Sequence, residues 1–103
     1  MSYQRRRLPS ISMLTAYDAA ARAGSFTAAA RELHVTQGAI SRQISALENQ
    51  LGIDLFIRNH KPLQLTNVGK TYAQEENAAL QSIRNASLAS ITKPRTGVLN
   101  LAN

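Results

Sequence analysis

Two helical segments of this chain are joined by only two residues, His34 and Val35. The first segment, "FTAAAREL", follows Ser25, whose hydroxyl makes it an N-cap candidate. The second segment follows Thr36, a further N-cap candidate, and ends at Gly52, a typical C-terminal stop. Two helices joined this tightly must cross steeply, which is the geometry of a helix-turn-helix.

A further helix is predicted directly before this pair. Ser10 is its N-cap candidate, residues Leu14, Tyr17 and Ala21 have helical spacing, and Gly24 is the stop.

With 103 residues, of which 44% are hydrophobic, the chain is long enough for one domain with a modest core and an appendage. It contains no cysteine, so neither a disulfide nor a thiolate metal site can hold the fold.

The charge of the chain indicates an anionic partner. Twelve Lys and Arg residues against six Asp and Glu residues give a net charge of +6, which suits nucleic acid but also an anionic membrane surface. A merely basic domain without such a partner is the third possibility. The sequence has no cysteine, no signal-peptide pattern and no run of membrane-spanning length, which predicts a soluble protein of the cytoplasm.

The helix that follows Thr36 has two unlike faces. Its apolar residues form one narrow stripe, which we expect to pack against the two preceding helices: Ile40, Ile44, Leu47 and Leu51. The opposite face carries small, hydrogen-bonding or cationic groups and no acid: Gly38, Ser41, Arg42, Ser45 and Asn49. Small side chains let a helix lie deep in a groove, and Ser and Arg reach base edges. Such a face is commonly just solvated, but beside a two-residue turn it predicts a recognition helix in the major groove of DNA.

A short hairpin is predicted after this helix. In "LFIRNHKPLQLT" the apolar residues lie on both sides of the polar turn "NHKP", and Pro62 marks the start of the returning edge. Arg58 at the base and Lys61 at the tip could place positive charge beside the DNA backbone or in the minor groove. The alternative is an ordinary solvated hairpin.

The segment 67–93, "NVGKTYAQEENAALQSIRNASLASITK", is predicted to form one long helix, because it contains no Pro and a single Gly. Its apolar stripe is interrupted by Glu75 and Glu76. A small domain cannot bury such a stripe alone, so we expect the helix to pair with a second copy of the chain, unless it packs entirely onto its own domain. The residues assigned to this pairing are Val68, Tyr72, Ala79, Leu80, Ile83 and Ala86.

With the wing in view, the chain resembles the N-terminal DNA-binding region of LysR-type transcriptional regulators. The resemblance is carried by "GSFTAAARELHVTQGAISRQISALENQLGIDLFIR" followed by "LQLTNVG", which match the ordered series of small, apolar and polar residues typical of the family. It spans Leu8 to about Ile91. Within the family, "RRRLPS" and "AAARAGSFTAAA" are similar to the branch of glycine-cleavage and β-lactamase regulators.

The resemblance implies a set of DNA contacts at matching positions. Groove contacts are implied for five residues of the recognition helix: Gln37, Gly38, Ala39, Ser41 and Arg42. Phosphate contacts are implied for Ser25, Thr27 and Thr36, and wing contacts for Arg58 and Lys61. Many members have Pro where this chain has Gly38, whose missing side chain lets the backbone come closer to the DNA instead.

The resemblance also implies three parts: a winged helix-turn-helix domain over residues 1–66, a linker and dimerisation helix over 67–93, and a hinge over 94–103. In this family a larger C-terminal domain binds a small effector, and "VLNLA" is similar to its first strand. We therefore expect the chain to be a DNA-binding fragment whose residues 96–103 are frayed or ordered only by intermolecular contacts. A small-molecule effector would act only on a full-length protein.

No other chemistry is indicated by the sequence. His34 and His60 have no spaced partner for a metal ion. No Ser, His and Asp residues have the spacing of a nucleophile elbow or an oxyanion loop. We therefore expect no enzymatic activity, no metal and no cofactor.

The sequence thus predicts a mainly α fold, in which a winged helix-turn-helix of three helices and a short β-hairpin is followed by a long dimerisation helix. The expected function is sequence-specific binding of double-stranded DNA as a homodimer, at an interrupted palindrome, to regulate transcription, with no membrane partner. Two other functions stay open: a winged helix that binds a partner protein, and a basic module that binds nucleic acid or membrane surfaces without specificity. Insensitivity to salt and to DNA sequence would favour the first, and binding to anionic vesicles or single strands the second.

Overall fold

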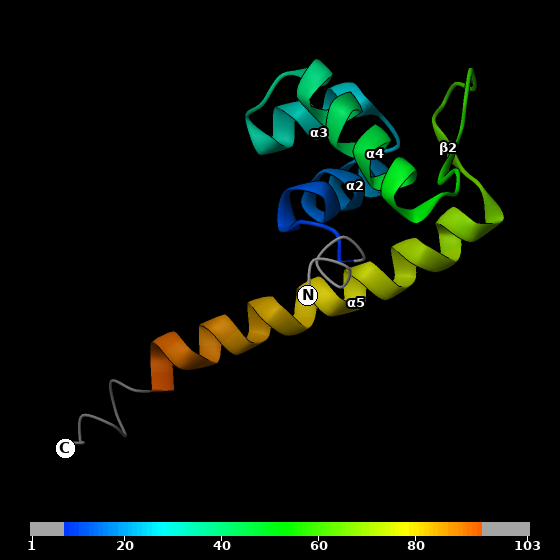
Figure 1. Cartoon of the computed structure of the whole chain (residues 1–103). Coiled ribbons are helices and arrows are strands. Elements are labelled where there is room, and N and C mark those ends of the chain that lie inside the picture. The colour runs from blue at the N-terminus through cyan, green and yellow to red at the C-terminus, as the bar shows by residue number, and fades with distance from the viewer. Residues whose placement is uncertain (1–7, 94–103) are drawn as a thin grey trace.

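The computed structural model of the protein describes residues 8–93. Three helices pack together beside a small hairpin, and a long helix runs beneath them (Figure 1). The elements are, in chain order, α2 (Ile11–Ala23), α3 (Phe26–Leu33), α4 (Gln37–Leu51), β1 (Phe56–Ile57), β2 (Gln64–Leu65) and α5 (Asn67–Lys93). This confirms the predicted mainly α winged helix-turn-helix with a long final helix. The hinge over 94–103 and the strand expected at "VLNLA" lie outside the described residues.

The three short helices begin and end where their capping residues predict. The hydroxyls of Ser10, Ser25 and Thr36 each accept a hydrogen bond from the backbone N–H three residues ahead, at 3.0–3.1 Å. Gly24 and Gly52 follow α2 and α4 with φ of 70° and 73°, the left-handed conformation that glycine adopts most easily.

The turn between α3 and α4 depends on His34, which also has a left-handed backbone, with φ of 59°. This conformation lets the next residue, Val35, donate its N–H back to the carbonyl oxygen of Ala30 at 3.0 Å. The chain has therefore already turned when α4 begins. As a result α3 and α4 contact each other, and both contact α2.

The core lies between α2, α3, α4 and the base of the hairpin. Its largest fully buried side chains are Tyr17, Ile40, Ile44, Leu47, Leu55 and Phe56. Three of the four predicted stripe residues of α4 are thus fully buried, and the fourth, Leu51, is half-buried. Tyr17 lies at the centre, where its ring meets Phe56 and Tyr72 edge to face, with centroids 5.4 and 5.6 Å apart.

The wing is a very short antiparallel hairpin. Phe56 lies opposite Leu65, and Ile57 lies opposite Gln64. Each strand has only two residues, so most of the wing is turn, with Asn59 left-handed at φ of 58°. The hairpin projects on the same side of the domain as α4, away from α5 (Figure 1).

The start of α5 is fixed to the domain by close backbone contacts. The Thr66 hydroxyl accepts from the Gly69 N–H at 2.9 Å and donates to the Asp54 carbonyl oxygen at 2.8 Å. A Cβ atom on Gly69 would overlap the carbonyl oxygen of Leu55, so only glycine allows this approach. The Tyr17 hydroxyl donates to the Gly69 carbonyl oxygen at 2.6 Å.

The apolar stripe predicted on α5 divides between two surfaces. Tyr72 packs against the core, and Leu80 is only 6% exposed within the single chain. Val68 and Ile83, by contrast, are 49% and 52% exposed, and the two alanines of the stripe, at positions 79 and 86, are exposed as well. From residue 81 to residue 91 every residue is exposed, so α5 does not pack entirely onto its own domain.

Candidate nucleic-acid interface

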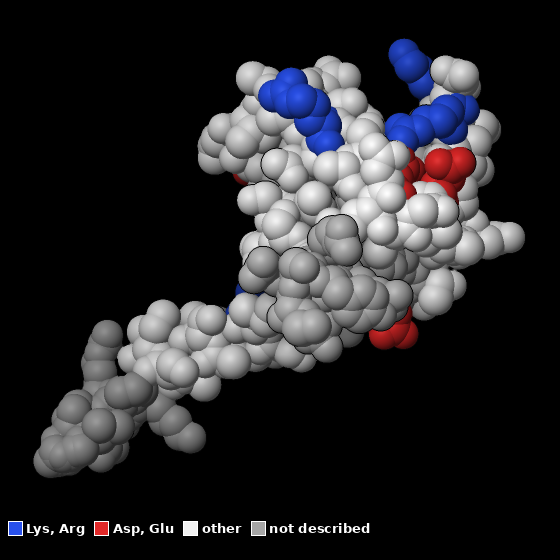
Figure 2. Space-filling model, viewed as in Figure 1, with Lys and Arg blue, Asp and Glu red and all other residues white. Residues whose placement is uncertain are grey.

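α4 carries the predicted acid-free face on the outside of the domain. Of the residues of this face, Gly38, Arg42, Ser45 and Asn49 are exposed and Ser41 is half-buried. Of the two other residues predicted to contact the groove, Gln37 is exposed and Ala39 is half-buried. Figure 2 shows Lys and Arg side chains along the upper edge of the molecule, over the helix-turn-helix and the wing. The predicted groove-contacting residues therefore share one surface with basic side chains.

A side-chain hydrogen bond links the first turns of α3 and α4, between Thr27, which is predicted to contact a phosphate, and Gln37, which is predicted to contact the groove. Thr27 donates from Oγ1 to Oε1 of Gln37 at 3.1 Å. The oxygens of Ser25 and Thr36 accept from backbone N–H groups as caps. A hydroxyl that accepts in this way still has its own hydrogen to donate, so capping and phosphate binding are compatible at both residues.

Arg42 and Gly38 are close neighbours on this face, one turn of α4 apart. A Cβ atom at position 38 would lie 3.3 Å from Nη1 of Arg42, so the guanidinium lies over the glycine. The space left by Gly38 is therefore occupied by the one cationic group of the face. Helical spacing places the two residues on one face, but the contact depends on the Arg42 rotamer, which the sequence does not specify.

The two cations of the wing differ in their surroundings. Lys61 is exposed in the turn of the hairpin. Arg58 forms an ion pair through Nη2 with Oε1 of Glu48, and its side chain stays 49% exposed. The structure thus places Arg58 at the inner side of the hairpin, next to α4.

Glu48 is a residue of the site that sequence reasoning missed. It lies off the acid-free face, as expected, but it is only 6% exposed. Its Oε2 accepts from the backbone N–H groups of Leu55 at 2.7 Å and Phe56 at 3.2 Å, while Oε1 pairs with Arg58. The sequence does contain an indication of this role. Position 48 is four residues after Ile44 of the apolar stripe, and a carboxylate on the buried side of a helix needs hydrogen-bond or ion-pair partners.

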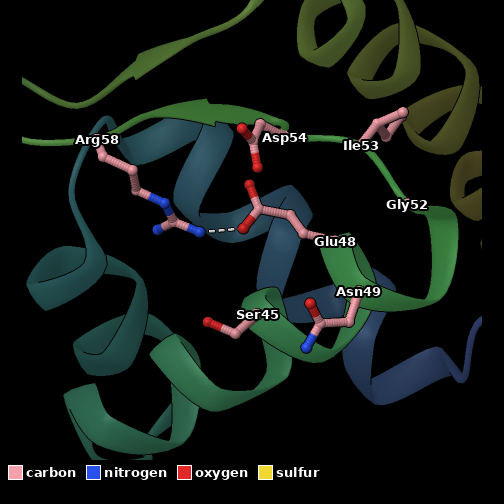
Figure 3. A pocket seen from close by; sticks show the side chains of 7 residues that line it. All are labelled: Ser45, Glu48, Asn49, Gly52, Ile53, Asp54 and Arg58. Carbon is pink, nitrogen blue, oxygen red and sulfur yellow. Dashed lines mark hydrogen bonds and ion pairs between the residues drawn. The ribbon is translucent and has the colours of Figure 1, made fainter.

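A notch of about 470 Å³ separates the C-terminal half of α4 from the wing (Figure 3). Its lining residues are Ser45, Glu48, Asn49, Gly52, Ile53, Asp54 and Arg58. Ser45 and Asn49 lie along α4 on one side, and Arg58 reaches in from the wing on the other. The walls therefore offer hydroxyl, amide and guanidinium donors, with the Glu48 and Asp54 carboxylates between them.

A second polar cluster, also missed from the sequence, joins the domain to α5. Asp18 is 3% exposed and accepts from Arg22 Nε and from Asn77 Nδ2, both at 3.0 Å. Arg22 also pairs with Glu32 of α3 at 2.6 Å. Asp18 and Arg22 together connect α2 with α3 and α5.

Glu76 lies in the same cluster and is 5% exposed, and neither carboxyl oxygen has a hydrogen-bond partner among the described residues. Burial, together with the nearby Asp18 carboxylate, raises the pKa of Glu76 to about 8. Burial alone would raise the pKa of Asp18 too, but hydrogen bonds from Asn77 and Arg22 hold it below its usual value. Glu76 is therefore mostly protonated at neutral pH.

Residues 8–93 contain neither a candidate metal site nor a candidate membrane span. No group of three or more His, Asp or Glu side chains there is arranged to hold a metal ion. No helix of that range combines the length and the apolar character needed to cross a membrane.

Residues 11–70 match the family described as "Bacterial regulatory helix-turn-helix protein, lysR family". The chain is 43% identical over 97 residues to the glycine cleavage system transcriptional activator homolog of Haemophilus influenzae, an alignment that covers 94% of this chain and 32% of that protein. It is 52% identical over 67 residues to the glycine cleavage system transcriptional activator of Escherichia coli K12, which covers 65% and 22%. The chain thus spans a third or less of the length of these relatives.

A solved structure with the same arrangement is the BenM_DBD/benA site 1 DNA complex. The chain is similar to that protein with a TM-score of 0.74 and 33% identity, over 82% of this chain and 92% of that one. The CbnR_DBD–DNA complex matches with a TM-score of 0.70 and 34% identity, over 79% and 93%. The likeness thus includes proteins whose structures were solved with DNA.

Proposed function

The chain belongs to the lysR family of bacterial regulatory helix-turn-helix proteins, and from this premise we propose that it binds double-stranded DNA sequence-specifically and regulates transcription. The observation that carries the proposal is the exposed, acid-free face of α4, which is presented beside a basic wing. Its small and hydrogen-bonding side chains suit a helix that enters the major groove. The DNA complexes of BenM_DBD and CbnR_DBD support it by their fold.

Each residue of the interface has a proposed role. Base edges and groove walls are contacted by Gln37, Gly38, Ala39, Ser41 and Arg42 of α4. Ser25 and Thr36 hold phosphates with their hydroxyl hydrogens, and Thr27 does the same when its hydroxyl hydrogen turns from Gln37 to the phosphate, since all three lie at the starts of the two helices. Arg58 and Lys61 bring the wing to the neighbouring stretch of backbone or to the minor groove.

We propose that the active form is a homodimer that pairs through α5. Support comes from the exposed part of the helix, where Ile83 and Ile91 are 52% and 55% exposed. Val68, Ala79 and Ala86 are exposed too and stay in the proposed interface. Tyr72 and Leu80 were assigned to this pairing from sequence, but their burial in the single chain gives them an internal role first. Two copies would read an interrupted palindrome, with half-sites about one helical turn of DNA, roughly 34–36 Å, or a multiple of it apart.

Three further proposals concern the protein's setting. It acts without enzymatic chemistry, as a regulator in the cytoplasm, where bacterial DNA lies. A small-molecule effector would act through a further domain in a longer protein.

A selection of duplexes from a random pool tests the proposed function. The chain should enrich one motif with inverted symmetry, and bind it about 10³-fold or more tightly than a scrambled duplex of the same composition at physiological salt. A protein-binding winged helix would enrich nothing. A nonspecific basic module would bind scrambled duplex, single strands and anionic vesicles equally well.

A further inference from the structure

We infer that Glu48 is the residue that positions the wing against the recognition helix and holds Arg58 over the notch between them. The inference rests on the proposed function and names a positioning residue of the same interface. Its basis is one buried carboxylate that receives three donors from the wing, namely the N–H groups of Leu55 and Phe56 and the guanidinium of Arg58.

The carboxylate accepts two consecutive backbone N–H groups at the base of the wing. β1 pairs on one edge with β2, through Phe56 and Leu65. Glu48 accepts the N–H groups of Leu55 and Phe56, and these two residues are 0% and 2% exposed. Buried backbone N–H groups without an acceptor are costly, so the wing base has its full set of hydrogen bonds only where Glu48 reaches it.

The wing depends on this contact because its own pairing is small. Two residues per strand provide few ladder bonds, so the angle of the hairpin depends on its contacts with the domain, which are the packing of the buried Phe56 and the hydrogen bonds to Glu48. α4, by contrast, is anchored by Ile44 and Leu47, which are both 0% exposed. A carboxylate on this rigid helix therefore sets the position of the hairpin and the width of the notch.

The ion pair also sets what Arg58 offers to DNA. A guanidinium has five N–H donors, and the Glu48 contact uses Nη2 while the side chain remains 49% exposed. Figure 3 shows Arg58 facing Glu48 across the notch, with Ser45 and Asn49 alongside. The remaining donors can bind a phosphate lying across the notch, but the charge of Arg58 is already balanced. Arg58 therefore fixes the orientation of a phosphate contact and adds little to the nonspecific attraction between the protein and DNA.

Hydrogen exchange of the 103-residue chain without DNA tests the positioning role. Glu48→Gln keeps an oxygen that accepts the two wing amides, whereas Glu48→Ala removes it. Exchange at Leu55 and Phe56 should rise about tenfold or more in Glu48→Ala and stay near wild type in Glu48→Gln, with α4 amides unchanged. Unchanged exchange at both wing amides in Glu48→Ala would overturn the inference.

Duplex titrations test the charge role, with the selected duplex and a scrambled one as probes. In Glu48→Gln the side-chain amide cannot hold the guanidinium, so binding to the scrambled duplex should tighten several-fold, and its log–log salt slope should steepen by about 0.9, the value for one phosphate contact. The preference for the selected duplex should fall by about 5- to 10-fold. Glu75→Gln, which removes an exposed acid of α5, is the control and should leave the preference unchanged.

If Glu48→Gln behaves as Glu75→Gln does, the charge role is wrong. A wild-type chain without preference between the two duplexes would instead contradict the proposed function. The exchange measurement needs no duplex, so it still decides whether Glu48 positions the wing. The two failures are therefore distinguishable.

Discussion

Gly38 and Arg42 show how a single missing side chain shapes the acid-free face of α4. The guanidinium of Arg42 lies so close to Gly38 that a Cβ atom at position 38 would be only 3.3 Å from Nη1. Because the neighbouring atom is the end of a flexible side chain, a methyl group at position 38 shifts the guanidinium by a few tenths of an ångström and leaves the helix intact. The stability and the base preference of α4 can therefore change independently.

The variant Gly38→Ala separates these two effects. Alanine in place of glycine within a helix should stabilise the fold by up to about 0.5–1 kcal/mol. The displaced Arg42 should weaken preference at one base pair of the selected duplex. Thermal unfolding and titration of a panel of single-base variants measure the two. A Gly38→Ala protein that is more stable and retains its base preference would show that the position of the Arg42 guanidinium over Gly38 does not determine base preference.

Glu76 should make the free energy of unfolding depend on pH, because its pKa in the folded protein is unusually high for a carboxyl group. Its pKa is about 8 in the folded protein, against 4.5 for an ordinary glutamate. The folded state therefore binds more protons than the unfolded state between these values, so the free energy of unfolding should fall as pH rises from about 4.5 to 8. Glu76→Gln should remove this fall and raise stability at pH 8 by about 1–3 kcal/mol.

Denaturant unfolding at pH 4.5 and pH 8 checks this expectation. Glu75 is the matched control, because its exposed carboxyl on the same helix should give Glu75→Gln the pH dependence of the wild type. Equal pH dependence in wild type and Glu76→Gln would mean that Glu76 ionises normally.

At the scale of elements, capping residues made the helices of this chain predictable. Thr36 both begins α4 and lies on the proposed DNA surface. Thr36→Ala should lower the free energy of unfolding by about 0.5–2 kcal/mol. It should also weaken binding to the selected and the scrambled duplex by the same factor, because a phosphate contact carries no sequence information. Ser10→Ala removes the corresponding cap of α2 and should lower stability without affecting DNA binding. Selective loss of the selected duplex in Thr36→Ala would contradict a phosphate role.

Helix periodicity predicted faces, but it could not say which neighbour each face meets. Ile40, Ile44 and Leu47 were placed in the core correctly, because an apolar stripe with caps at both ends has one interpretation. Glu76, in contrast, was expected to interrupt a surface stripe, and it is buried. Whether α5 packs against α2 or a partner depends on the close approach at Gly69, which no local pattern reveals.

The proposed interface follows from the sequence where its residues lie on one helix, but not where it depends on contacts between elements. The reading face of α4 follows from 100° per residue, so Ser41 and Arg42 could be placed from spacing alone. The contact of Glu48 with the wing joins residues seven to ten positions apart across a turn whose geometry the sequence does not specify. Arg58 was therefore predicted as a wing cation without its partner.

The complete molecule is proposed to consist of two copies joined by the exposed part of α5. Ile83→Asp should yield monomers that still fold, because Ile83 is 52% exposed and makes no part of the core. Sedimentation measures the assembly, and circular dichroism checks the fold. Gln81→Asp places the same charge elsewhere on the helix and should remain dimeric. Leu80→Asp is a poor test, since burial of Leu80 means that it should unfold the α5 junction as well. A wild-type chain that is monomeric at high concentration would overturn this proposal.

The central claim is that the acid-free face of α4 reads base pairs, and titration of Arg42→Ala against selected and scrambled duplexes tests it most directly. Lys70→Ala, which removes the same charge from the start of α5, is the control. Arg42→Ala should reduce the binding free energy for the selected duplex by about 1–3 kcal/mol, which is about 5- to 150-fold in affinity, and should reduce that for the scrambled duplex far less. The preference at one base pair of the selected duplex should be relaxed. Lys70→Ala should change both affinities little and equally. If Arg42→Ala weakens binding to both duplexes by the same factor, α4 does not read sequence through Arg42.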